Sequence, residues 1–142
     1  MRPAASLFGR CLRSPDHRRR LPGELVKYLF VLNDPPYGTE RTFNGIRWAR
    51  QMLESDPGNE VRVFNFADAV ISVSAGQKVP TGYYNLAKMT SALVEKGGVI
   101  GNCSACMDAR GLSDDRLIDG VHRSSMAELA QWTAWADQVI TL

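Results

Sequence analysis

Two cysteines separated by two residues, Cys103 and Cys106, carry the clearest chemistry in the sequence. The thiolate is the nucleophilic form of cysteine, and it attacks disulfides and persulfides. Cys103 follows a short apolar segment where a helix is expected to begin, and the free amides of a helix start lower the pKa of a thiol. Arg110 would add positive potential if the chain folds back. The spacing therefore predicts a reactive Cys103, with Cys106 on the same helical face as a second, resolving thiol.

The cysteine pair could also bind a metal, form a redox-active disulfide or serve only in packing. A structural zinc site needs four ligands, and neither His17 nor His122 has a partner at ligand spacing, so we expect no metal. The thioredoxin fold needs a proline after its cysteines, whereas the last proline here is Pro80. Dithiol redox chemistry on another fold stays open, because a C-x-x-C turn can meet the distance limits of a disulfide. Two small buried packing residues are the remaining interpretation.

Segments with strand-like and helix-like patterns alternate from residue 25 onward. Short loops between such segments indicate a parallel sheet with helices on both faces. We therefore predict an α/β fold, a three-layer α/β/α sandwich with a mainly parallel sheet of about five strands and a flavodoxin-like layout. The expected strands are Val26–Leu32, Val61–Phe66, Val99–Asn102 and Val139–Leu142. One expected helix begins after the N-cap Thr39 with Glu40 in its first turn, a second spans Tyr83–Lys96 and ends at Gly97-Gly98, and a third begins at the capping box Ser125-x-x-Glu128. The segment Ala67–Gln77 is expected to form one or two helical turns.

Open sheets of this kind bind ligands beyond the carboxyl ends of their strands. Three loops are expected there: Asn33–Thr39, Ala67–Gln77 and Asn102–Cys106. The first loop has one glycine and two prolines without amide donors, which makes it a poor phosphate cradle. We expect no nucleotide or other cofactor, and we interpret this loop as a rigid wall beside the cysteine loop.

Composition sets the class of protein. The chain has 142 residues, 44% hydrophobic and 23% charged, which is ordinary globular usage and excludes a disordered, collagenous or coiled-coil protein. No stretch approaches the roughly 18 uncharged apolar residues that a membrane span requires. Three cysteines are too few for a secreted disulfide scaffold. We therefore expect one cytoplasmic domain that contacts neither membrane nor nucleic acid.

The first 22 residues differ from the rest. Residues 1–20 carry six Arg and one Asp, whereas residues 21–142 carry 11 basic and 14 acidic side chains. This basic N-terminal segment, residues 1–22, is interpreted as a disordered tail or an extension of the chain, with a mitochondrial targeting peptide as the alternative. Residues 23–142 form the expected domain.

The sequence also resembles the DsrE/DsrF/TusD family of sulfur-relay proteins, and within it the YchN-like branch. The resemblance covers residues 26–142. Its matching stretches are Asn33–Trp48, Phe64–Val70, Gly76-Gln77-Lys78, Gly82-Tyr83, Cys103-x-x-Cys106-x-Asp108-x-Arg110-Gly111, Leu117–Val121 and Glu128–Thr133.

This resemblance implies a DsrE-like three-layer fold and a homomeric trimer or hexamer. In the relay members the sulfur-carrying cysteine is followed seven and eight residues later by Arg-Gly, and Cys103 meets that spacing with Arg110-Gly111. Cys106 matches the second cysteine of the YchN-like branch. A lone cysteine suits a carrier that passes sulfur on, whereas a dithiol can also release sulfide by closing a disulfide.

The expected function is therefore intracellular sulfur transfer as a persulfide on Cys103, with protein donors and acceptors, by a carrier rather than a stand-alone enzyme. Cys106 is expected to act as the second thiol. The expected binding residues are Asn33, Tyr37, Asp108, Arg110 and Gly111. A non-catalytic oligomeric binding module and a small dithiol redox protein are the alternatives.

Overall fold

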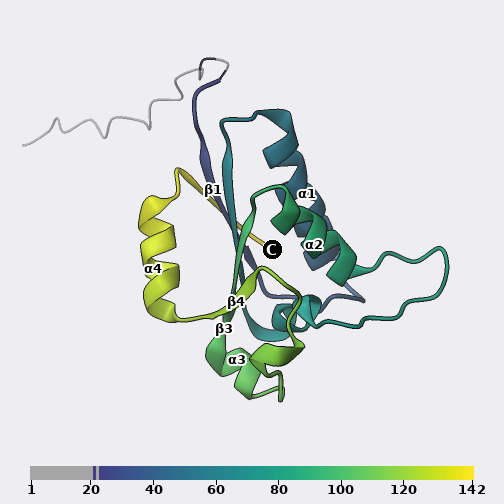
Figure 1. Cartoon of the computed structure of the whole chain (residues 1–142). Coiled ribbons are helices and arrows are strands. Elements are labelled where there is room, and N and C mark those ends of the chain that lie inside the picture. Colours follow the sequence, from purple (N-terminus) through teal and green to yellow (C-terminus); the bar gives the residue numbers. More distant parts are fainter. Residues whose placement is uncertain (1–20, 22) are drawn as a thin grey trace, which may run out of the picture.

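Five parallel strands form one sheet in the order β4-β3-β2-β1-β5 (Figure 1). The structure is a computed structural model that describes Leu21 and residues 23–142. The strands are β1 (Lys27–Leu32), β2 (Glu60–Asn65), β3 (Val99–Cys103), β4 (Val121–Ser124) and β5 (Gln138–Thr141). The predicted parallel sheet of about five strands is confirmed.

Helices cover both faces of this sheet. Helices α1 (Arg41–Ser55) and α2 (Leu86–Glu95) lie on one face, and α4 (Met126–Trp135) lies on the other (Figure 1). The short helix α3 (Ser104–Asp108) and the 3-10 helices η1 (Ala67–Val73) and η2 (Asp114–Arg116) belong to the loops around the sheet. The three-layer α/β/α sandwich is therefore confirmed.

The core consists of two apolar layers, one on each face of the sheet. Side chains of successive strand residues point to opposite faces, so Phe30 packs in the layer under α1 and α2 while Leu29 packs in the layer under α4. Both are fully buried because β1 is flanked by β2 and β5 and covered on both sides. Each such side chain contributes about 1.5–3 kcal/mol through removal from water.

Gly101 of β3 lies in the layer under α4. A methyl group there would come within 3.1 Å of Cη2 of Trp132 and 3.0 Å of Cβ of Ser124. Trp132 is 4% exposed, and its ring packs against Phe64 with the centroids 6.1 Å apart. The absence of a side chain at Gly101 therefore lets α4 lie close to the sheet.

Several helix boundaries follow the predicted capping residues. Ser125 is the N-cap of α4, and its side chain accepts a hydrogen bond from the Glu128 amide, as the capping box requires. Helix α2 ends where expected, with Gly97 at φ +95° and the Gly98 amide bonded to the Leu93 carbonyl.

Other boundaries differ from the prediction. The N-cap position of α1 is Glu40, in the left-handed region at φ 62°, without a side-chain cap. Thr39 instead donates its hydroxyl to the Asp34 carboxylate. Helix α2 begins at Leu86, because Asn85 accepts from the Lys88 amide at 3.0 Å. Strand β4 was not predicted.

The predictions for residues 1–22, including the interpretation as a tail, extension or targeting peptide, lie outside the described residues apart from Leu21. Within the described part of the chain, no helix has the length and hydropathy that a membrane crossing requires.

Candidate functional site

The site begins where β3 ends. Cys103 is the last residue of that strand and the N-cap of α3, so it occupies the predicted junction of strand and helix. Its side chain is 8% exposed and packs in the layer under α4 with Met107 and Leu112. Both Cys103 and Cys106 are free thiols.

The electrostatics of Cys103 differ from the expectation. Burial raises the pKa of its thiol, and a hydrogen bond to the Cys106 side chain raises it further, while the amides of Cys106 and Ala105 offset part of the rise. The predicted lowering of the pKa by a helix start is therefore wrong in its net direction. Helix α3 has five residues, so its dipole is too short to outweigh burial.

Cys106 has a different environment. It is partly buried, and its Sγ accepts a hydrogen bond from the Ala67 amide at an N···S distance of 3.2 Å. Ala67 is the first residue of η1, one residue beyond the residue that follows β2, and has φ 44°, a conformation that residues with a Cβ adopt at a cost in free energy. The turn after β2 therefore directs an amide N–H at the second thiol.

Arg110 does fold back on the cysteine turn. Its Nη1 donates to the Cys106 carbonyl at 3.0 Å, and its Nε donates to the Asp68 carboxylate at 2.8 Å. Asp68 lies in η1, one residue after Ala67. Arg110 thus joins the turn that holds the cysteines to the segment that donates to Cys106.

Asp108 lies at the end of α3 and accepts a 2.7 Å bond from Nη1 of Arg123. Arg123 also donates to Asp114 at 2.7 Å and to the Ser104 carbonyl at 3.3 Å. Its guanidinium therefore connects β4 to both ends of α3. Sequence reasoning did not single out Arg123, because its partners lie 9 to 19 residues away and its strand has no apolar pattern.

Gly111 closes the turn after α3. Its φ of +61° is a left-handed conformation that favours glycine, and it follows directly on Arg110. A shallow hollow of about 280 Å³ lies beside it, lined by Asp108, Gly111, Leu112, Ser113 and Arg123.

Asn33 and Tyr37 lie on the neighbouring loop rather than on the cysteine turn. The Asn33 amide and side chain both donate to the Leu142 carbonyl, at 3.0 and 3.3 Å. Tyr37 bonds Gln77 at 3.2 Å and stacks on another tyrosine. The register places Asn33 level with Cys103 but two strands away, which corresponds to roughly 10 Å.

A polar cluster lies on the opposite side of Cys103. Ser124 is the register partner of Cys103 on β4, and its hydroxyl donates to the Glu128 carboxylate. His122, which also lies in β4, has its Nε2 2.9 Å from the same carboxylate oxygen. Burial raises the pKa of Glu128, but the hydrogen bonds from Ser124 and His122 lower it by more.

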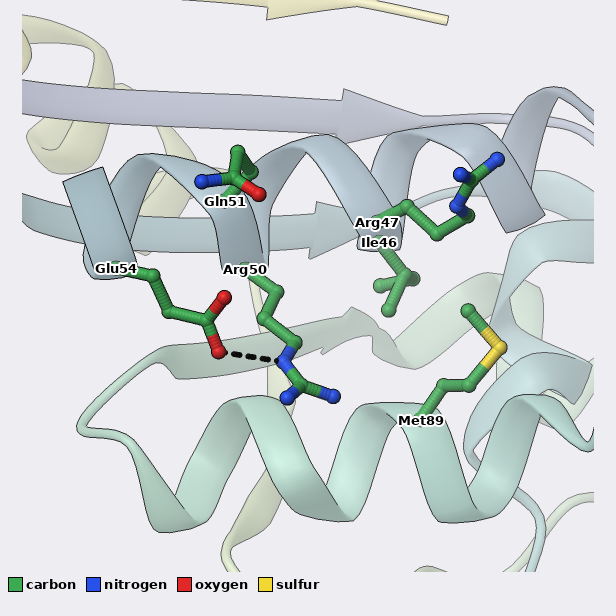
Figure 2. A pocket seen from close by; sticks show the side chains of 6 residues that line it. All are labelled: Ile46, Arg47, Arg50, Gln51, Glu54 and Met89. Atoms are coloured by element: carbon green, nitrogen blue, oxygen red, sulfur yellow. Dashed lines mark hydrogen bonds and ion pairs between the residues drawn. The ribbon is translucent and has the colours of Figure 1, made fainter.

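Another hollow lies away from the predicted site residues. A hollow of about 240 Å³ lies between α1 and α2 (Figure 2). Arg50, which points into it, is bonded to Glu54, as Figure 2 shows, and Lys96 also pairs with Glu54. Within residues 21 and 23–142, no three His, Cys, Asp or Glu side chains converge as a metal ion would require.

Comparison with known proteins identifies relatives of the whole domain. Residues 26–142 match the DsrE/DsrF-like family. Protein YchN of Escherichia coli strain K12 is 40% identical over 117 residues, which cover 82% of this chain and 99% of that protein. An uncharacterized protein of Methanopyrus kandleri is 34% identical over 110 residues, which cover 78% of this chain and 88% of its own length.

Solved structures include proteins with the same fold. The crystal structure of E. coli YchN superimposes with a TM-score of 0.78 at 39% identity, over 82% of this chain and 99% of that chain. A protein of unknown function from Methanobacterium thermoautotrophicum superimposes with a TM-score of 0.68 at 16% identity, over 82% of this chain and 99% of its own. At that low identity the second likeness concerns the fold alone.

Proposed function

The chain belongs to the DsrE/DsrF-like family, and from this premise we propose that it transfers sulfur as a persulfide on Cys103, with Cys106 as the second thiol. The observation that carries the proposal is the pairing of two free, hydrogen-bonded thiols at the carboxyl end of β3. Ligands of open parallel sheets bind at this edge.

The overall reaction conserves atoms and electrons. A persulfide donor R–S–SH and the Cys103 thiol exchange to give R–SH and Cys103–S–SH, so one S–S bond is broken and one is formed. Cys103 lies in an apolar layer with Met107 and Leu112, which keeps its sulfur away from most thiols in solution. Storage of a reactive persulfide fits such a position better than rapid exchange does.

We further propose that the protein works as a homomeric trimer or hexamer in the cytoplasm and exchanges sulfur with protein donors and acceptors. Family membership supports this assembly. Light scattering behind size exclusion, on the full chain, measures the mass in solution. A monomeric mass at micromolar concentration would contradict the proposed assembly.

Intact-protein mass spectrometry tests the transfer itself. Reduced protein is incubated without oxygen with glutathione persulfide, and the expected product gains one sulfur, about 32 Da, that dithiothreitol removes. Peptide mapping should place the sulfur on Cys103. The control carries Ser at both Cys103 and Cys106 and should gain nothing at either position.

The hydrogen-bonded pair also supports a second candidate function, a dithiol redox protein. In that case the persulfide R–S–SH oxidises the pair and is itself reduced to R–SH and hydrogen sulfide, so the product loses two hydrogens by forming a Cys103–Cys106 disulfide and gains no sulfur. The same mass spectra separate the two functions, because the first adds mass to the reduced chain and the second removes it.

A further inference from the structure

The two thiols differ in access. Cys103 is 8% exposed and lies beneath α4, whereas Cys106 is partly exposed on the following helical turn. A donor sulfur has to approach in line with the S–S bond that breaks, so the attacking sulfur needs free space on one side. Cys106 meets this requirement better than Cys103 does.

The two thiols also differ in their ability to hold negative charge. The Ala67 amide donates to Cys106 Sγ at 3.2 Å, and such a bond stabilises a thiolate more than a thiol. Ala67 presents that amide from a left-handed backbone conformation, with φ 44°. Arg110, which is paired with Asp68, also ties the same turn in place by donating to the Cys106 carbonyl.

Cys103 behaves in the opposite way. Burial raises the pKa of its thiol, and the neighbouring Cys106 raises it further, so less of Cys103 is in the nucleophilic thiolate form near neutral pH than for an ordinary cysteine. Burial and this raised pKa both make Cys103 poorly suited to the first attack on a donor.

We propose that Cys106 is the entry thiol, which accepts the sulfane sulfur from the donor and passes it inward to Cys103. This inference rests on the proposed function. It assigns the first nucleophilic step to the cysteine that the sequence analysis treated as the resolving thiol.

Both steps balance without an oxidant or a reductant. In the first, the Cys106 thiolate attacks the outer sulfur of R–S–SH, the S–S bond breaks, and RS⁻ leaves with the electron pair to give Cys106–S–SH. The Cys106 persulfide then loses its proton to solvent. In the second, Cys103–SH and Cys106–S–S⁻ exchange to Cys103–S–SH and Cys106–S⁻: the proton passes from Cys103 to the sulfane sulfur, the Cys103 sulfur attacks that atom, and Cys106 leaves as the thiolate.

The test is a time course of sulfur loading with glutathione persulfide as the probe. All proteins carry Cys11→Ser, so that the only thiols left are Cys103 and Cys106. Samples are quenched by alkylation, and the sulfur is located by peptide mapping. Cys103→Ser should load at the parent rate but hold its sulfur on Cys106. Cys106→Ser should load on Cys103 about tenfold or more slowly, because rate follows thiolate fraction and access.

Each result has a distinct meaning. Parent-rate loading of Cys106→Ser, or failure of Cys103→Ser to load, would overturn the inference and leave Cys103 as the first acceptor. Failure of the parent protein to load would instead contradict the proposed function. Cys103→Ala is a second variant, since a serine hydroxyl in the apolar layer can destabilise the fold, and circular dichroism confirms that each variant is folded.

Discussion

Replacing Gly101 with alanine tests how tightly α4 is packed over the cysteine edge of the sheet. The added methyl would lie 3.0 Å from Ser124 Cβ and 3.1 Å from Trp132 Cη2. Favourable carbon–carbon contacts lie at about 3.5–4.0 Å, so both neighbours have to give way by a few tenths of an ångström. Trp132 cannot move freely, because Phe64 and His122 both contact its ring edge-on.

The expected loss follows from two opposing terms. Overpacking a filled layer costs about 1–3 kcal/mol. Replacing a strand glycine by alanine restores about 0.5–1 kcal/mol, because the unfolded chain loses conformational freedom. Gly101→Ala should therefore lower the free energy of unfolding by about 1 kcal/mol, up to about 2, which corresponds to roughly 4–8 °C in Tm for a domain of this size.

Thermal and urea unfolding followed by circular dichroism measure this loss. Gly58→Ala is the matched control, because its methyl would have no neighbour closer than 3.4 Å, and it should stay within about 0.5 kcal/mol of the parent. An unchanged or higher stability of Gly101→Ala would refute the packing argument and mean that α4 shifts without cost.

Three further predictions concern the site. Arg123→Met should speed amide hydrogen exchange over residues 104–114 and alkylation of Cys106, because the guanidinium ties α3 to β4. Hydrogen exchange in the strands should stay the same, and unchanged exchange over residues 104–114 would contradict this prediction. The pKa of Glu128 is lowered from its ordinary value of 4.5, so its ionised carboxylate stabilises the fold at pH values above 4.5. This contribution is lost as the pH falls through the folded-state pKa. Glu128→Gln should therefore weaken the fall of the unfolding free energy at acid pH. In Cys106→Ser, alkylation of Cys103 should rise with a midpoint above the ordinary value of 9.0, since burial raises its pKa; a lower midpoint would show that the amides outweigh burial.

The layers of the fold could be read from the sequence because buried parallel strands are apolar and helices carry capping residues. Val26–Leu32 and the Ser125 capping box are of this kind, and both are confirmed. Strand β4 could not be read, because it has four residues and pairs on one side only, so polar side chains such as His122 and Arg123 are tolerated. The α1 start was misplaced because Glu40 adopts a left-handed conformation that its residue type does not favour.

The candidate site was predictable in its location but not in its electrostatics. The strand end at Cys103 and the proximity of Arg110 follow from local spacing. The burial of Cys103 under α4 and the hydrogen bond from the Ala67 amide do not follow from local spacing, because both come from segments 20 to 40 residues distant in sequence. These long-range contacts give the two thiols different surroundings, which local spacing does not predict.

The pairing of β5 with β1 has a consequence for the newly made chain. Tyr28 lies opposite Gln138 in the register, so this contact joins segments 110 residues apart and is slow to form. Helix α4 contributes Trp132 to the apolar layer in which Cys103 is buried, and α4 precedes β5 in the chain. During synthesis from the amino terminus the cysteine turn therefore exists before its cover does. Both thiols are most open to oxidants and to donors in that interval, and the ribosome-bound chain is the form in which irreversible oxidation of Cys103 should be fastest.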